Sequence, residues 1–266
     1  MNLKTHVDLV IFDWAGTMVD FGCEAPVKAL MEAFGAAGVD IDEATARRDM
    51  GKAKRDHVQA ILGDPGVAAA WRARHARGPD AGDIDTLMQR LGPLMRQQAA
   101  LAATLIPGAL QAFRQLRGAG IRIASSTGYS REMLEPVLAS AASQGYLPEH
   151  VVCAGETPSG RPSPLMTYKA CAELGVWPLS RVVKVDDAEV GVAEGKAAGA
   201  FTVGVASGNT LGLSRQALHA LPASERESRL AGARQKLLNA GADLAVESVA
   251  QLLPALERAT LARSRV

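Results

Sequence analysis

Residues Val7 to Thr17 read VDLVIFDWAGT, and this stretch decides the fold. The run up to Asp13 is too uniformly apolar for a strand with one solvated face, which indicates the centre of a parallel sheet. Ligands of open α/β sheets bind beyond the carboxyl ends of the strands. Asp13 is therefore expected at a ligand-binding edge, where Gly16 permits a tight turn whose N–H groups face an anion.

Four later stretches have a similar β-branched character and also predict strands: Ile121–Thr127, His150–Gly155, Arg181–Asp187 and Phe201–Ser207. Helical patterns lie before and between them, at Ala109–Gly118, Arg131–Gln144, Pro164–Leu174 and Val190–Ala198. Strand and helix alternating at this spacing predict a doubly wound parallel sheet, which is a Rossmann-like α/β core.

The segment between the first two strands, from Asp13 to Ile121, is far longer than the dozen or so residues of a simple crossover. It is rich in Ala, Arg, Leu and Gln, has helical periodicity and predicts no strand. The expected helices are Ala25–Ala36, Asp42–Met50, Lys54–Leu62, Gly66–Arg77 and Asp83–Ala103. We therefore expect an α/β core of residues 1–22 and 105–266 with an all-helical insertion of residues 23–104.

The C-terminal part of the chain continues the α/β pattern. It predicts a helix at Glu225–Ala240, a strand at Asp243–Val246 and a last helix that ends near Leu261.

The amino-acid composition limits the classes of partner that the protein is expected to bind. The chain has 266 residues, of which 48% are apolar, and a formal net charge of +1, which excludes a disordered chain and gives no support for nucleic-acid binding. Cys23, Cys153 and Cys171 have no CxxC spacing, so we expect free thiols. No run approaches the roughly 18 apolar residues of a membrane helix, and no secretory signal precedes Asp13. We expect a cytoplasmic protein without a membrane partner.

Chemically useful side chains recur where the predicted strands end. Asp13 follows the first strand, and Thr127 ends the second before a helix that Ser130 can cap, an arrangement that suits phosphate oxygens. Asp186 and Asp187 end a third strand, where paired carboxylates can hold a divalent cation such as Mg²⁺. Arg161 supplies a fixed positive charge near a strand end. Each residue alone is weak evidence, but the set in this order is specific.

This set resembles the haloacid dehalogenase superfamily, whose first motif is DxDGT or a close variant. The resemblance covers Val7–Asp13 and most of residues 108–207. It implies that Asp13 becomes a phosphoaspartate, that Thr127 binds phosphate, that Arg161 stands where lysine is usual and that Asp187 helps to bind Mg²⁺. It also implies that the helical insertion is a cap that closes over the site.

Two departures narrow the expected chemistry. Phosphatases of the superfamily carry a second Asp two residues after the nucleophile as general acid, and here that residue is Ala15. Loss of a general acid costs about a hundredfold or more when the leaving group is an alkoxide. The second departure is Lys54, which shares a helix face with Met50 and His57 if the helix runs through Met50. A lysine amine with a lowered pKa can condense with a carbonyl, and His57 can move the protons.

Both departures fit cleavage of a C–P bond. Attack on phosphorus expels a carbanion, and a protonated imine one carbon away accepts its electrons to give an enamine. No alkoxide forms, so Ala15 is tolerable. The substrate is then a phosphonate with a carbonyl one carbon removed, of which phosphonoacetaldehyde is the simplest.

Five segments resemble the phosphonatase family in particular: FDWAGTMVDFGCEAP (residues 12–26), MGKAKRDHV (50–58), STGYSREM (126–133), GRPSP (160–164) and KVDDAEVGVAEG (184–195). The resemblance implies a Schiff base on Lys54 and a homodimer formed through the caps. It implies that Mg²⁺ is held by Asp13, the Ala15 carbonyl and Asp187. It also places Cys23, Met50, His57, Gly128 and Tyr129 near the substrate.

Several alternatives stay open at this point. Many superfamily members have another Asp four residues after the metal-binding one, where this chain has Gly191, so Asp186 is a further possible ligand, directly or through water. Cys23 can simply pack, Tyr129 can anchor a helix start, and His57 can be a solvated helix residue. For the whole chain, the rivals are a phosphatase or sugar-phosphate mutase, a Schiff-base lyase or aldolase, and a non-catalytic binding protein.

Overall fold

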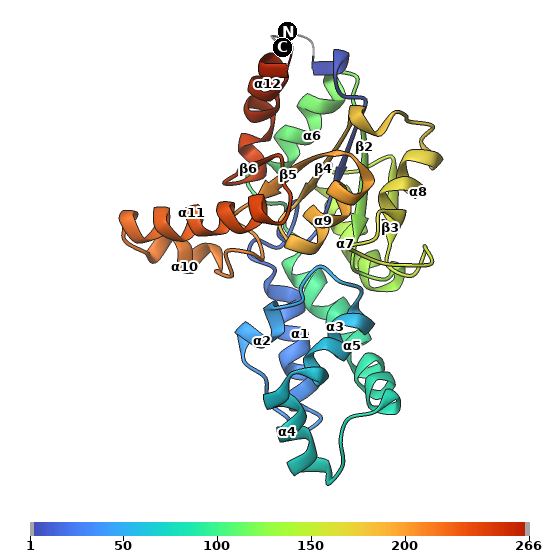
Figure 1. Ribbon diagram of the computed structural model, residues 1–266, viewed down its shortest axis with the longest axis vertical. Helices are drawn as coiled ribbons and strands as arrows, with labels where there is room; N and C mark the ends of the chain where they lie inside the picture. Colours follow the sequence, from blue (N-terminus) through green and yellow to red (C-terminus); the bar gives the residue numbers. More distant parts are fainter. Residues whose placement is uncertain (1–2, 264–266) are drawn as a thin grey trace.

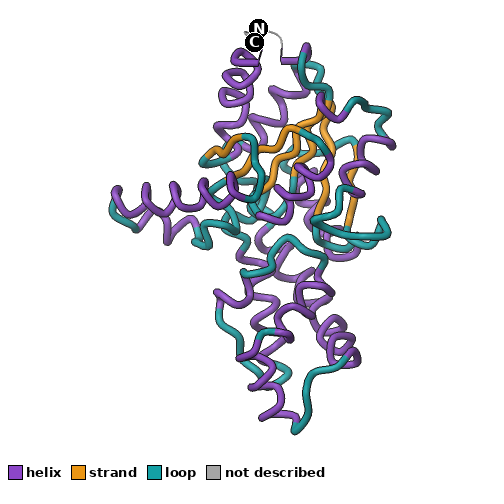
Figure 2. The backbone as a smooth tube through the Cα atoms, viewed as in Figure 1, coloured by secondary structure: helices purple, strands orange, loops and turns teal. Residues whose placement is uncertain are grey.

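The computed structural model describes residues 3–263, and its centre is a six-stranded sheet in which all neighbouring strands are parallel (Figures 1 and 2). The order across the sheet is β3–β2–β1–β4–β5–β6. The strands are β1 (Leu9–Phe12), β2 (Arg122–Thr127), β3 (His150–Cys153), β4 (Val182–Asp186), β5 (Phe201–Val205) and β6 (Leu244–Val246). The strand order reverses between β1 and β4, and the predicted doubly wound sheet is thereby confirmed.

Helices cover both faces of the sheet. Val10 and Phe12 of β1 point into one hydrophobic core with α6, α7 and α12, whereas Leu9 and Ile11 pack with α8 on the other face. This is why the first strand has no polar alternation. Helices α9 and α11 pack on β4, β5 and β6. The bounds of these helices are α6 (Ala109–Gly118), α7 (Arg131–Ser143), α8 (Leu165–Glu173), α9 (Glu189–Ala198), α11 (Ala223–Asn239) and α12 (Leu252–Arg263).

Five helices between β1 and α6 form a second, all-helical lobe at one end of the sheet (Figure 1). They are α1 (Glu24–Gly35), α2 (Glu43–Arg47), α3 (Lys54–Gly63), α4 (Pro65–His75) and α5 (Ala81–Ala102). Helices α1 and α5 pack along each other, with Leu30, Phe34, Leu87 and Leu91 buried. Residues 24–102 are called the helical lobe below.

The two connections between the sheet and the helical lobe run side by side. Val19 and Leu105 form an antiparallel bridge, and Ile106 N donates to Met18 O at 2.8 Å. The predicted domain division, with a core domain of residues 1–22 and 105–266 and a helical cap domain of residues 23–104, stays a prediction. In the described part of the chain, no helix is long and apolar enough to span a bilayer.

Two local features differ from expectation. Helix α2 ends at Arg47, so Met50 lies in the turn before α3 and not on a common helix face with Lys54 and His57. Gly51 has a φ of 95°, and this left-handed conformation interrupts the helix. The short helix α10 (Arg215–Ala220) was not expected.

Candidate active site

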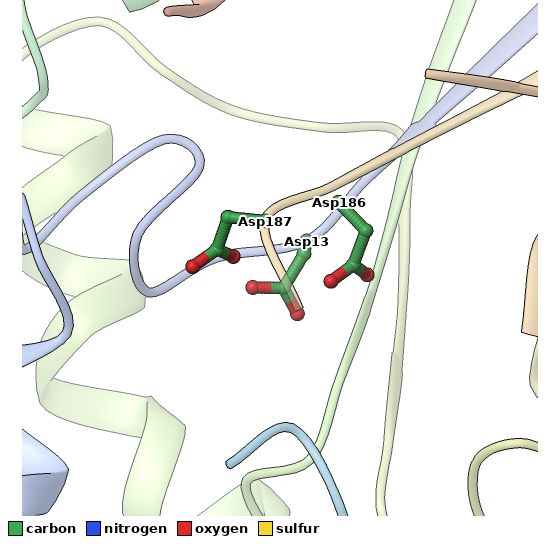
Figure 3. Close-up of side chains that lie close together, drawn as sticks. All are labelled: Asp13, Asp186 and Asp187. Carbon is green, nitrogen blue, oxygen red and sulfur yellow. The ribbon is translucent and has the colours of Figure 1, made fainter. Parts of the chain in front are cut away.

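Three carboxylates meet at the carboxyl edge of the sheet (Figure 3). Asp13 follows β1 and its N–H donates to Val185 O of β4 at 2.9 Å, while Asp186 ends β4 and Asp187 follows it. Each offers one oxygen within 4.8 Å of the others, and all three residues are buried. The parallel pairing of β1 with β4 therefore brings the predicted nucleophile to the predicted metal-binding pair.

Two buried cations neutralise part of this charge. Arg161 Nη2 lies 2.8 Å from Asp13 Oδ1 and 3.3 Å from Asp186 Oδ2, and its Nε lies 2.9 Å from Glu194 Oε2. Lys184 Nζ lies 2.5 Å from Asp186 Oδ2. The four buried carboxylates thus exceed Arg161 and Lys184 by two formal charges when all are ionised, and by one when the buried Lys54 is also protonated.

Burial and the excess negative charge shift the pKa values of the carboxyl groups. Burial, reinforced by the charge of Asp186, raises the pKa of Asp13 and that of Asp187 above their ordinary range. Burial also opposes ionisation of Asp186, but Arg161 and Lys184 outweigh it, and the pKa of Asp186 is lowered. Asp13 and Asp187 together therefore present the unneutralised charge, which a divalent cation would match.

The donor set fits Mg²⁺. Hard oxygen ligands are available from the two carboxylates and from the Ala15 carbonyl, which accepts from Cys23 Sγ at 2.9 Å. Asp187 accepts only neutral donors among the bonds found in residues 3–263: Thr17 Oγ1 at 3.0 Å, Asn209 N at 2.6 Å and Cys23 Sγ at 3.4 Å. Cys23 thus donates hydrogen bonds to the Ala15 carbonyl and to Asp187, in addition to packing in the core.

The second strand end carries the residues expected to bind phosphate. Thr127 ends β2, its Oγ1 accepts from Tyr129 N at 3.2 Å, and Ser130 caps α7 by accepting from Met133 N, as expected. A Cβ on Gly128 would lie 2.6 Å from Lys52 O and 2.7 Å from Gly51 O. The backbone of the helical lobe is therefore seated directly on this strand end.

Lys54 is the first residue of α3 and reaches into the interface between the sheet and the helical lobe. Its side chain is buried, with Nζ 3.6 Å from Met50 Sδ and 5.5 Å from the ring centroid of Tyr129. Burial and, to a lesser extent, the charge of Arg161 lower the pKa of Lys54 to about 8. The positive end of the α3 dipole acts in the same direction.

His57 lies one turn further along α3 and is completely buried, so it is not a solvated helix residue. Neither ring nitrogen has a hydrogen-bond partner among residues 3–263. Burial, followed by the charge of Lys54, lowers the pKa of His57 to about 3, which keeps the ring neutral near pH 7.

A narrow cavity lies between the helical lobe and the carboxyl edge of the sheet. All the residues that we predicted for the site line it, with two exceptions, His57 and Asp186. Buried carboxylate, hydroxyl, guanidinium and amine groups from both lobes thus converge on one small space.

The chain has relatives among known proteins. Residues 7–199 match the family model of haloacid dehalogenase-like hydrolases. The chain belongs to this family. The hydrolase is 45% identical over 250 residues to the phosphonoacetaldehyde hydrolase of Paraburkholderia xenovorans, with 94% of each chain covered. It is also 45% identical over 244 residues to that of Syntrophobacter fumaroxidans, covering 91% of this chain and 88% of the relative.

A solved structure agrees in fold. The phosphonoacetaldehyde hydrolase-like protein of Oleispira antarctica superposes on the hydrolase with a TM-score of 0.95 at 38% identity, covering 98% of this chain and 95% of the other. A hydrolase from Pseudomonas syringae, at 16% identity and a TM-score of 0.72, shares the fold.

The sequence did not reveal three residues of the site. Asn209 lines the cavity, its N–H donates to Asp187, and its Nδ2 lies 3.5 Å from Arg47 O in the helical lobe. It follows the end of β5, so the strand-end rule that found Asp13 could have found it. Lys184 and Glu194 are buried charges, and a lysine inside the apolar run of β4 was the available signal for one of them.

Proposed function

We propose that this hydrolase cleaves the C–P bond of phosphonoacetaldehyde to give acetaldehyde and phosphate, with Mg²⁺ bound. The observation that carries the proposal is that Lys54, a buried amine with a pKa lowered to about 8, lines the same cavity as Asp13. Two relatives with 45% identity are named for this activity, which supports it further.

Lys54 acts first in the proposed reaction. Its neutral amine adds to the aldehyde carbon, and loss of water leaves an iminium ion that joins Nζ to the substrate. Asp13 then attacks phosphorus, the C–P electron pair moves into the iminium, and the carbon fragment becomes an enamine on Lys54. Protonation of the enamine carbon and hydrolysis of the resulting iminium release acetaldehyde, while water hydrolyses the phosphoaspartate on Asp13.

The other residues hold charge and exclude water. In the proposed reaction, Arg161 and Thr127 bind the phosphonate oxygens; the contact of Arg161 with Asp13 and the position of both residues in the cavity lining support this role. Mg²⁺, held by Asp13, Asp187 and the Ala15 carbonyl, would neutralise the charge that the anionic nucleophile and the phosphonate bring together. Ala15 offers no proton, and the enamine leaving group needs none on oxygen.

His57 is proposed to move protons during imine formation at Lys54, although a pKa lowered to about 3 makes its ring a weak base near pH 7. Its buried ring is neutral, and it lies one helical turn from the amine but outside the cavity lining. Replacement by Gln should slow imine formation without changing the chemistry of Asp13. The homodimer formed through the caps and the cytoplasmic location stay predictions, the first of which sedimentation of the purified protein would test.

Borohydride trapping tests the proposal directly. Incubation with phosphonoacetaldehyde and borohydride should reduce an adduct onto Lys54 and abolish phosphate release. Lys52→Met is the matched control, because Lys52 is a half-exposed neighbour paired with Asp49. Asp13→Ala should stop phosphate release and still permit trapping.

Each rival reaction predicts a different result. A phosphatase or mutase would act on phosphate esters and be indifferent to Lys54→Ala. A lyase or aldolase would keep its activity in Asp13→Ala. An adduct on another residue, or none, would rule out the imine.

A further inference from the structure

We propose that Asp186 is a positioning residue for Arg161 and not a ligand of the metal, and that Gly191 is the residue that makes room for it. The inference rests on the proposed function, in which Asp13 is the nucleophile that Arg161 accompanies. It assigns different tasks to the two carboxylates of the Asp186–Asp187 pair.

The hydrogen bonds of Asp186 are those of a neutralised anion. Its Oδ2 lies 2.5 Å from Lys184 Nζ and 3.3 Å from Arg161 Nη2, and its Oδ1 accepts from Ala188 N at 3.1 Å. Both oxygens therefore have donors, and one of them faces two cations. A metal ion on Asp186 would have to compete with the fully buried Lys184, whereas Asp187 faces neutral donors.

The backbone around Asp186 is shaped to its carboxyl group. A Cβ on Gly191 would lie 2.1 Å from Asp186 Cγ, so the carboxyl group occupies the space that any side chain at position 191 would need. Ala188, the N-cap residue of α9, has no capping side chain of its own, and Asp186 accepts its N–H instead. Asp186 is thus fixed by the start of α9 on one side and by Lys184 on the other.

The same contacts fix the guanidinium. Glu194 accepts a hydrogen bond from Arg161 Nε. Asp186 and Asp13 both form ion pairs with Arg161 Nη2. The Ser126 carbonyl accepts from that nitrogen at 2.8 Å. Arg161 is therefore held through Nε by Glu194 and through Nη2 by Asp13 and Asp186, and Lys184, which also neutralises Asp186, does not line the cavity.

A charge-neutral double variant separates positioning from metal ligation. Lys184→Met with Asp186→Asn removes one cation and one anion, so the net charge at the site is retained. Titration calorimetry with Mg²⁺ should give an affinity within about threefold of the wild type. Asp187→Asn should weaken Mg²⁺ binding by about 100-fold or more. A loss in the double variant as large as that of Asp187→Asn would overturn the inference.

Kinetics of the same double variant report on Arg161. The kcat for phosphate release should fall about 10- to 100-fold, while the KM for phosphonoacetaldehyde changes little. An unchanged kcat would also overturn the inference. If the wild type released no phosphate from this substrate, the proposed function would fail, and the Mg²⁺ titrations would still decide the role of Asp186.

A second variant covers the case in which the first does not fold. Asp186→Gly with Gly191→Asp exchanges the two side chains, so that a carboxylate enters the same space from α9. It should recover at least about tenfold of the kcat lost in Asp186→Gly alone, because Lys184 and Arg161 regain an anion. A thermal melt shows whether the exchange variant folds. If it folds and its kcat is no higher than that of Asp186→Gly, the claim that residues 186 and 191 share one space for a carboxylate is refuted.

Discussion

Arg161 Nη2 lies 2.8 Å from Asp13 Oδ1, and the charge of the same guanidinium helps to lower the pKa of Lys54. One buried cation therefore acts on both proposed reaction centres. It favours the ionised nucleophile, because the charge of Arg161 opposes the rise in the pKa of Asp13. It also disfavours the ammonium form of the amine that must attack the aldehyde.

The pH dependence of imine formation follows from Lys54. Only the neutral amine attacks a carbonyl, and the pKa of Lys54 is lowered to about 8. The rate of borohydride trapping should therefore rise about tenfold per pH unit below this value and level off above it. Lys52→Met should leave the profile unchanged. A rate that does not vary between about pH 6 and pH 8 would contradict a lysine that must first lose its proton.

Gly128→Ala should prevent the helical lobe from seating on the sheet. The added methyl group would lie 2.6 Å from Lys52 O, and backbone atoms cannot yield as a side-chain end can. We expect kcat/KM to fall by about 100-fold while the melting temperature changes little, because we predict a cap that opens and closes, and the clash would then arise only in its closed position. Gly160→Ala is the control, since its Cβ would meet Ala53 Cβ at an ordinary 3.6 Å. Equal effects of the two substitutions would exclude this explanation.

Magnesium should stabilise the protein more at high pH than at low pH. The pKa of Asp13 is raised from 3.8 to about 8, so the folded protein binds more protons than the unfolded chain between these values. The free energy of unfolding of the metal-free protein then falls as pH rises across this window. Mg²⁺ at 100 times its Kd adds about 2.7 kcal/mol, and protons compete with it at the lower end.

Melting temperatures measured with and without Mg²⁺ at pH 5.5 and pH 8 test this expectation. Asp187→Asn should show almost no shift with Mg²⁺ at either pH. A shift in the wild type that is no larger at pH 8 than at pH 5.5 would contradict this expectation, because it would mean that the carboxylates are already ionised at pH 5.5 in the metal-free protein.

Asn209→Ala should weaken closure without removing a metal ligand. The side-chain amide reaches Arg47 O in the helical lobe, whereas the bond to Asp187 comes from the backbone and survives the substitution. Loss of one such hydrogen bond costs about 1 kcal/mol, so KM should rise roughly fivefold with Mg²⁺ affinity unchanged. Asn239→Ala on the exposed side of α11 is the control. A loss of Mg²⁺ binding in Asn209→Ala would contradict this division of roles.

Much of the fold follows from local pattern. Apolar runs such as the one ending at Asp13 predict parallel strands because both faces of the sheet are covered, and α6 begins directly after Pro107-Gly108. The positions of Asp13, Thr127 and Asp187 follow from strand ends, which meet at one edge of any such sheet. These residues could be predicted without any knowledge of long-range contacts.

The remainder depends on packing between distant segments. Whether His57 reaches the cavity is set by the rotation of α3 against the sheet, which periodicity does not encode. The partnership of Asp186 with Lys184 depends on which way each side chain turns at the end of β4 and on the missing Cβ of Gly191. Met50 contacts Lys54 from a turn and not from the same helix, because the left-handed conformation of Gly51 prevents a continuous helix between them.

The bridge between Val19 and Leu105 has a consequence for how such enzymes diversify. Because the two connections to the helical lobe are already hydrogen-bonded side by side, the length of the segment between them adds little to the entropy cost of closing the loop. Recombination at Asp20 and at Thr104 could therefore exchange the whole helical lobe and leave β1 and α6 in place. The carbonyl chemistry of Lys54, which the helical lobe supplies, and the phosphorus chemistry of Asp13 could then evolve at separate rates within a single chain.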